Sequence, residues 1–162
     1  MTKKLILIAV ILTLIIQPVY SAKALEGLVK FIGRGNAIVF LEVADTPEKR
    51  EKGLMNKYNL PQNRGMVFVF KPAQRVTFWM KDTFISLDMI FINNSTIVNI
   101  AKNTLPNQIT TLYPSNFEVT EVIEVNGGFS DSHMIKVGDK VTFENIAQID
   151  YSKNSELMIV SK

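Results

Sequence analysis

Two carboxylic acids in apolar surroundings are the strongest candidates for chemistry in this sequence. Asp88 stands near the start of the apolar stretch Leu87 to Asn93, and Glu124 lies between Ile123 and Val125. Carboxylates are rarely fully buried unless a partner compensates for the lost water. Beside a basic side chain in a cleft, such a group can orient a ligand or transfer a proton. Each of the two acids therefore calls for a partner or a function.

The segment around Asp88 supplies a partner if it folds as an antiparallel hairpin about residues 82–87. This pairing predicts three opposed pairs, which are Lys81 with Asp88, Trp79 with Ile90, and Phe78 with Phe91. One face then carries a core set consisting of Phe78, Met80, Met89 and Phe91. The preferred interpretation is that Lys81 and Asp88 only hold the hairpin register at the surface, for about 1 kcal/mol or less. In the alternative, the pair lines a cleft beside Trp79.

Glu124 also has two interpretations. The preferred one is a glutamate on an edge strand, and the alternative is acid–base chemistry together with Asp88. Neither a catalytic residue nor a metal site is predicted, because His133 is the single histidine, on an expected surface turn, and cysteine is absent. The sequence has no phosphate-binding glycine motif, and no cofactor is expected.

The elements that must position these residues are mostly short strands. The sequence predicts them over 37–43, 66–70, 76–81, 87–93, 96–101, 118–125 and about 141–144, with a last one over 157–160. Short helices are expected after Thr46-Pro47, ending at Gly53, and within 129–135. We therefore expect a mainly β (α+β) fold, a compact barrel-like or sandwich domain with two short helices.

The stretch Met66 to Phe70 indicates how deeply the sheet is buried. Met66, Phe68 and Phe70 alternate with Val67 and Val69, so both faces of this strand are apolar. A strand with two apolar faces is predicted to be covered on both sides.

The N-terminus has the three parts of a secretory signal peptide. Lys3 and Lys4 precede an uncharged run from Leu5 to Ile16, and small residues follow. The run is shorter than the about 20 residues that a membrane span needs. We predict a signal peptide over 1–21, cut after Ser21 or alternatively after Ala24, then a lead-in over 22–34 and a single β-rich domain over 35–162. No stable membrane span is expected after cleavage, and the protein is expected to be exported, either periplasmic or secreted.

The charge balance argues against nucleic acid as a partner. The chain has 18 Lys and Arg against 15 Asp and Glu, and removal of Lys3 and Lys4 with the leader leaves a net charge of +1. A nearly neutral chain with scattered basic residues lacks the electrostatic footprint that a phosphate backbone requires.

Five ordered motifs resemble the domain-of-unknown-function 192 family over about residues 36–145. They are Glu42-Val43-Ala44-Asp45-Thr46-Pro47, Arg50 with Gly53-Leu54-Met55, Gly65-Met66-Val67-Phe68, Phe78-Trp79-Met80-Lys81 followed by Leu87-Asp88, and the stretch from Val122-Ile123-Glu124 to Ile135-Lys136-Val137-Gly138-Asp139. The resemblance implies a compact, mainly β, barrel-like domain and no particular activity. Family members often carry cysteines in the central loop, and this chain has none.

No specific biochemical function follows from these residues. The favoured hypothesis is a non-enzymatic binding or interaction module of the cell envelope, whose partner is a small ligand or an envelope protein. The binding face is expected to comprise Trp79, Lys81, Asp88, Arg50 and Glu124. One alternative is a hydrolase-like enzyme that uses Asp88, Glu124 and Lys81, and another is a structural envelope protein.

Overall fold

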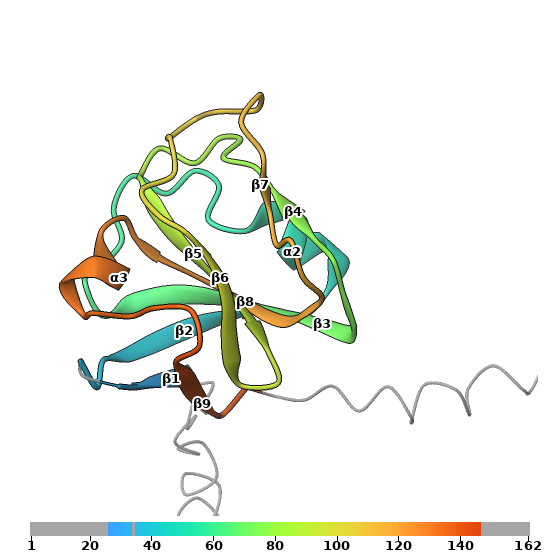
Figure 1. Ribbon diagram of the computed structural model, residues 1–162. Coiled ribbons are helices and arrows are strands. Elements are labelled where there is room, and N and C mark those ends of the chain that lie inside the picture. Colours follow the sequence, from blue (N-terminus) through green and yellow to red (C-terminus); the bar gives the residue numbers. More distant parts are fainter. Residues whose placement is uncertain (1–25, 34, 147–162) are drawn as a thin grey trace, which may run out of the picture.

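Seven strands close into a β-barrel in the computed structural model, which describes residues 26–33 and 35–146 (Figure 1). The strands are β1 (Gly27–Ile32), β2 (Ile38–Ala44), β3 (Arg64–Gln74), β5 (Leu87–Asn93), β6 (Thr96–Ala101), β8 (Val119–Asn126) and β9 (Lys140–Glu144). Their order around the barrel is β1-β2-β3-β8-β5-β6-β9. Only β2 and β3 pair in parallel, and the other neighbours in this part of the chain are antiparallel. The expected mainly β fold is confirmed, in its barrel form.

The smaller elements lie on two sides of the barrel. Helix α2 (Pro47–Lys52) and a two-stranded ribbon of β4 (Thr77–Phe78) with β7 (Tyr113–Pro114) lie beside β3, and α3 (Phe129–Ser132) lies on the opposite side (Figure 1). The helical signals are confirmed, since the hydroxyl of Thr46 accepts a hydrogen bond from the Lys49 amide and Gly53 ends α2. No described helix is long and apolar enough to cross a membrane.

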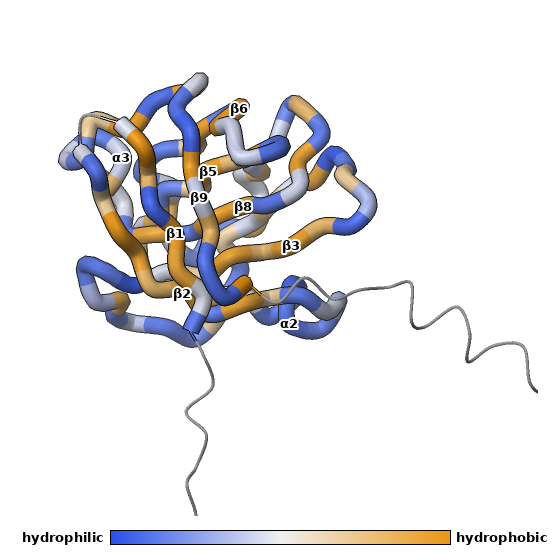
Figure 2. The backbone as a smooth tube through the Cα atoms, turned by 90° about the horizontal axis from the view of Figure 1, so that it is seen from below, coloured by the Kyte–Doolittle hydropathy of each residue, from blue (hydrophilic) through white to orange (hydrophobic). Residues whose placement is uncertain are grey.

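Two hydrophobic clusters occupy the two faces of the central strands. The barrel strands carry the apolar stretches of the chain, whereas α2 is hydrophilic (Figure 2). Along β3, Val67 belongs to the cluster inside the barrel, whereas Met66, Phe68 and Phe70 belong to a second, outer cluster. The outer cluster covers the far faces of β3, β8 and β5 with side chains that include Leu54, Met80, Phe78 of β4 and Tyr113 of β7. The expectation that Met66 to Phe70 is buried on both faces is confirmed.

The predicted hairpin between residues 76–81 and β5 is wrong. Strand β4 is limited to Thr77–Phe78 and pairs with β7, while β5 lies between β6 and β8. Both hydrogen-bonding edges of β5 are therefore already occupied, so Lys81 is not opposite Asp88, nor Trp79 opposite Ile90. The prediction that Phe78, Met80, Met89 and Phe91 belong to the core is confirmed. Met80, Met89 and Phe91 are buried in the outer cluster, and Phe78 packs against them.

Strand β1 lies within the expected lead-in over 22–34. Gly27–Ile32 pairs with both β2 and β9 and so closes the barrel. Val29 and Phe31 point inward and Lys30 outward, a period of two that is typical of a half-buried strand. The last predicted strand, over 157–160, lies outside the described residues.

Candidate functional site

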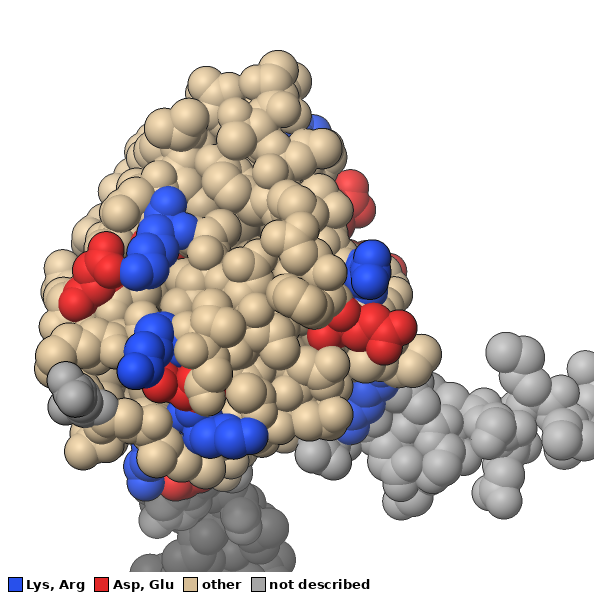
Figure 3. Space-filling model, viewed as in Figure 1, with Lys and Arg blue, Asp and Glu red and all other residues tan. Residues whose placement is uncertain are grey.

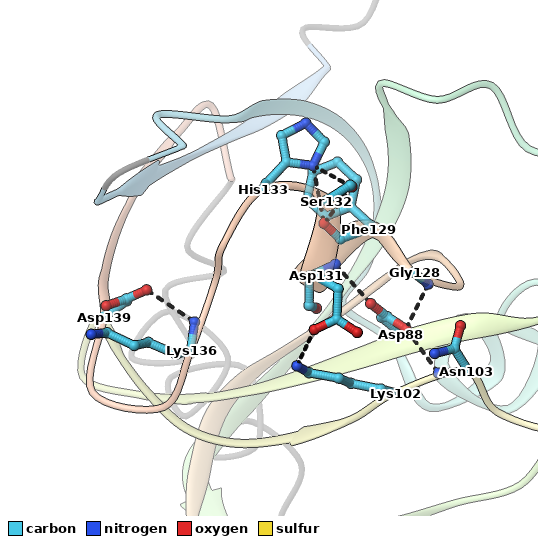
Figure 4. Close-up of polar contacts among 11 residues, drawn as sticks. Asp88, Lys102, Asn103, Gly128, Phe129, Asp131, Ser132, His133, Lys136 and Asp139 are labelled. Atoms are coloured by element: carbon cyan, nitrogen blue, oxygen red, sulfur yellow. Dashed lines mark hydrogen bonds and ion pairs between the residues drawn. The ribbon is translucent and has the colours of Figure 1, made fainter.

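Asp88 is fully buried at the start of β5, and backbone amides satisfy it (Figure 4). Its Oδ1 accepts hydrogen bonds from the amides of Asn103 at 2.9 Å and Gly128 at 3.1 Å, and its Oδ2 accepts one from Ser130 at 2.8 Å. These donors belong to the loop after β6 and to the start of α3. Asp88 therefore ties two loops to the barrel, and the expected ion pair with Lys81 is wrong in either of its interpretations.

Glu124 is buried without such compensation. It lies in the C-terminal half of β8, in register with Met66 on β3 and Met89 on β5, and only 4% of it is exposed. The preferred interpretation as an edge-strand glutamate is wrong, because β8 is central. No hydrogen bond or ion pair joins its carboxyl to another described residue. Burial alone raises the pKa of Glu124 to about 8, so the group is protonated at neutral pH.

Glu124 faces a cavity of about 340 Å³ between the outer face of the barrel, α2 and β4. Four of the five residues expected to share one face line this cavity: Arg50, Trp79, Lys81 and Glu124. Asp88 is not among the lining residues and belongs to the α3 side of the barrel. The structure thus brings four of the five expected residues to one cavity, and it separates the carboxyl group of Asp88 from that of Glu124.

Arg50 is held in place at the helical side of the cavity. Its Nη1 donates to the carbonyl oxygens of Asp45 at 2.9 Å and Val69 at 3.1 Å, and its guanidinium carbon lies 5.4 Å from the ring centroid of Phe70. This side chain therefore anchors α2 to the middle of β3. Its position in the wall is fixed by contacts that exist without a ligand.

The mouth of the cavity carries an aromatic and a basic side chain in contact. Trp79 is 44% exposed, and the Lys81 Nζ lies 5.5 Å from its ring centroid, a distance suited to a cation–π interaction. The side chains of Trp79 and Lys81 are exposed, whereas Glu124 is buried. Glu124 is therefore the innermost charged or titratable residue of the wall. Leu54, Phe68 and Phe78 supply apolar surface between the two ends.

Basic residues that the sequence analysis did not single out complete the mouth. Lys52 at the end of α2 and Arg75 before β4 line the cavity and are exposed. Neither of them, nor Lys81, forms a salt bridge with any described residue. No local sequence signal marks Arg75, since its position depends on how the segment between β3 and β4 folds over the sheet.

Outside this cavity, His133 and the charged residues of the barrel surface indicate a functional site less clearly. His133 stacks on Phe129 at 4.1 Å and its Nδ1 lies within hydrogen-bonding distance of the Ser132 hydroxyl (Figure 4). Within residues 26–33 and 35–146, no group of three or more His, Asp or Glu side chains could hold a metal ion. On the face in Figure 3, basic and acidic side chains alternate over the lower part of the barrel, and the upper part carries few charges.

The amino-acid sequence matches the family described as DUF192, an uncharacterized ACR, over residues 29–143. The chain belongs to the DUF192 family. The match begins within β1 and ends within β9, so it spans the whole barrel. Because this description assigns no activity, membership of the DUF192 family establishes the domain and leaves its function open.

Two solved structures resemble this DUF192 chain. A "putative transcription regulator" from Sinorhizobium meliloti 1021 is 29% identical with a TM-score of 0.70, over 76% of this chain and 97% of that one. A protein of unknown function from Novosphingobium aromaticivorans DSM 12444 is 34% identical with a TM-score of 0.68, over 78% and 90% of the two chains. Comparison with curated proteins finds no significant match.

The first prediction concerns the three amides that surround Asp88. Asp88→Asn replaces one accepting oxygen with a donor that faces backbone N–H groups, so we expect a loss of roughly 2–4 kcal/mol in the free energy of unfolding. The control is Asp131→Asn, which breaks an exposed ion pair with Lys102 and should cost under about 1 kcal/mol. Urea denaturation of both variants measures the difference, and equal small losses would contradict the structural role of Asp88.

The second prediction concerns the pH dependence that Glu124 imposes on stability. Its pKa is about 8 in the folded chain and about 4.5 when unfolded, so between these values the folded state holds a proton that the unfolded state has lost. The contribution of Glu124 therefore makes the protein less stable as pH rises through this window, by a total on the order of 4–5 kcal/mol.

Replacement of Glu124 by Gln removes this pH dependence while it preserves the shape of the side chain. Glu124→Gln should match the parent protein near pH 4 and exceed it in stability near pH 9. Glu118→Gln, at an exposed position before β8, is the control and should follow the parent at both pH values. Thermal unfolding across the pH range is the measurement, and parallel profiles for the parent and Glu124→Gln would sink the assignment.

Proposed function

We propose that this DUF192 protein is a non-enzymatic binding module of the cell envelope and that the cavity beside Glu124 receives a small molecule. The observation that carries the proposal is a carboxyl group that is buried, has no partner among the described residues, and faces an open cavity. Burial of a polar group without a hydrogen bond costs free energy. A leucine or methionine at this position would serve the outer cluster better, so stability does not account for Glu124.

The arrangement of the wall supports binding rather than hydrolysis. The alternative enzyme required Asp88, Glu124 and Lys81 to act together, but the oxygens of Asp88 are occupied by three backbone amides away from the cavity. A protonated Glu124 is both a donor and an acceptor of hydrogen bonds, which suits the recognition of a polar group. The lining combines polar and charged side chains with apolar ones such as Phe68, Phe70 and Phe78. Polar groups that converge beside apolar surface are characteristic of small-molecule sites.

The name of the Sinorhizobium protein does not lead us to propose a role in transcription. With the leader removed, the chain has a net charge of only +1. In addition, basic and acidic side chains alternate on the face shown in Figure 3. Sequence-independent binding to DNA depends on a concentrated positive surface. We therefore retain a small molecule as the proposed partner.

Binding in the cavity is tested with a library of small fragments and amide chemical shifts in NMR spectra. We expect fragments that bind to shift the amides of Leu54, Thr83 and Glu124 together, because these residues line one cavity. Glu124→Leu should stabilise the fold near neutral pH and weaken the binding of these fragments, since it fills the wall but removes its polar group.

Glu121→Gln is the matched control for that experiment. Glu121 lies on the same strand, is partly buried and does not line the cavity, so the variant should bind fragments as the parent does. Fragments that shift only residues elsewhere on the barrel, or equal binding by Glu124→Leu, would refute the proposal.

Location in the envelope rests on the N-terminal leader, which lies outside the described residues. Lys3, Lys4 and the apolar run to Ile16 support export, and small residues follow at the expected distance. Mass spectrometry of protein from the native envelope should find a mature N-terminus at Ala22 or Leu25. Intact chain that begins at Met1 in a soluble cytoplasmic fraction would rule out export.

A further inference from the structure

The wall of the Glu124 cavity has an uneven charge distribution. Four basic side chains line it, and Glu51 is the one acidic residue besides Glu124 among the lining residues. With Glu124 protonated, the lining carries a net charge of +3. With Glu124 protonated as well, the whole chain after loss of the leader would carry only +2, so the lining is more positive than the rest of the chain.

Three of the basic residues are available to a ligand. Arg50 is engaged with two backbone carbonyl groups and the Phe70 ring. Lys52, Arg75 and Lys81 are exposed and have no salt bridge within the described part of the chain. Unpaired cations at the mouth of a cavity attract anions and set their orientation.

Polarity changes along the depth of the cavity. Beyond the basic mouth, the wall is formed by Phe68, Phe70 and Phe78, and the half-exposed Trp79 offers a ring face beside Lys81. The inner end presents the carboxyl of Glu124 between two methionines of neighbouring strands. A ligand that matches these three regions has a charged end at the mouth, an apolar body along the wall and an uncharged end beside Glu124.

We propose that the cavity binds a small amphipathic organic anion, such as a carboxylate or a phosphate monoester, with its charged group at Lys52, Arg75 and Lys81 and its apolar body against the phenylalanine wall. This inference rests on the proposed binding function and specifies the ligand class. A cationic ligand would meet the basic mouth first, and a wholly apolar ligand would leave those charges unused.

Trp79 provides a local signal for the test, because it is the only tryptophan in the sequence. Its emission is titrated with four probes that share one alkyl chain, namely octanoate, octyl phosphate, octyltrimethylammonium and 1-octanol. We expect the two anions to bind at least about tenfold more tightly than the cation, with octanol between them. The comparison of octanoate with octyl phosphate distinguishes the two kinds of anion.

Variants of the mouth separate charge from hydrophobic contact. The double variant Arg75→Ala/Lys81→Ala should weaken octanoate binding about tenfold and leave octanol binding within about twofold. Lys136→Ala removes an exposed cation that does not line the cavity and should bind all probes as the parent does.

The results distinguish an error in the ligand class from an absence of binding in the cavity. Equal or tighter binding of the cation or of octanol would overturn the anion assignment while binding in the cavity stands. Failure of all four probes to change the Trp79 emission would also overturn it, and the fragment experiment then decides separately whether the cavity binds any small molecule.

Discussion

Coverage of β3, β8 and β5 on both faces is the constraint on which the rest of this structure depends. A barrel buries one face of each strand, and the opposite face of these three strands is buried again beneath β4, β7 and the segments that carry Leu54 and Met80. Along these central strands, the side chains that point into the barrel and those that point out of it are therefore both removed from water. Polar side chains placed there need hydrogen bonds from the protein, or they remain unsatisfied until another molecule supplies them.

The two buried carboxyl groups illustrate these two outcomes. Asp88 lies at the start of β5, where chain segments from the loop after β6 and from α3 bring three amides to its oxygens. Glu124 lies within β8, where neighbouring amides are already used in the sheet and the adjacent side chains on the flanking strands are methionines. Asp88 fixes the positions of two loops, whereas Glu124 gives the cavity a polar inner end beside apolar side chains such as Phe68 and Phe78.

The position of Trp79 and Lys81 depends on chain segments that leave the barrel. If residues 76–81 had paired with β5, both side chains would have lain on the sheet beside Asp88. Instead β4 pairs with β7, and the following segment crosses over the outer cluster to form the mouth of the cavity. Because this segment leaves the sheet, it forms one wall of the cavity that the Glu124 carboxyl faces.

Local signals in the sequence determined the parts of the fold that depend on neighbouring residues. Thr46, Pro47 and Gly53 set the limits of α2, and the alternation from Met66 to Phe70 indicated a strand buried on both faces. Tertiary structure alone decided which strands are neighbours, because β8 contacts β3 and β5 across long stretches of chain. That choice placed Glu124 in a central strand, gave Asp88 amides in place of Lys81, and assembled four of the five expected residues around one cavity. Pairing between distant segments is decided by the combined burial of many side chains, and no short segment of sequence contains that information.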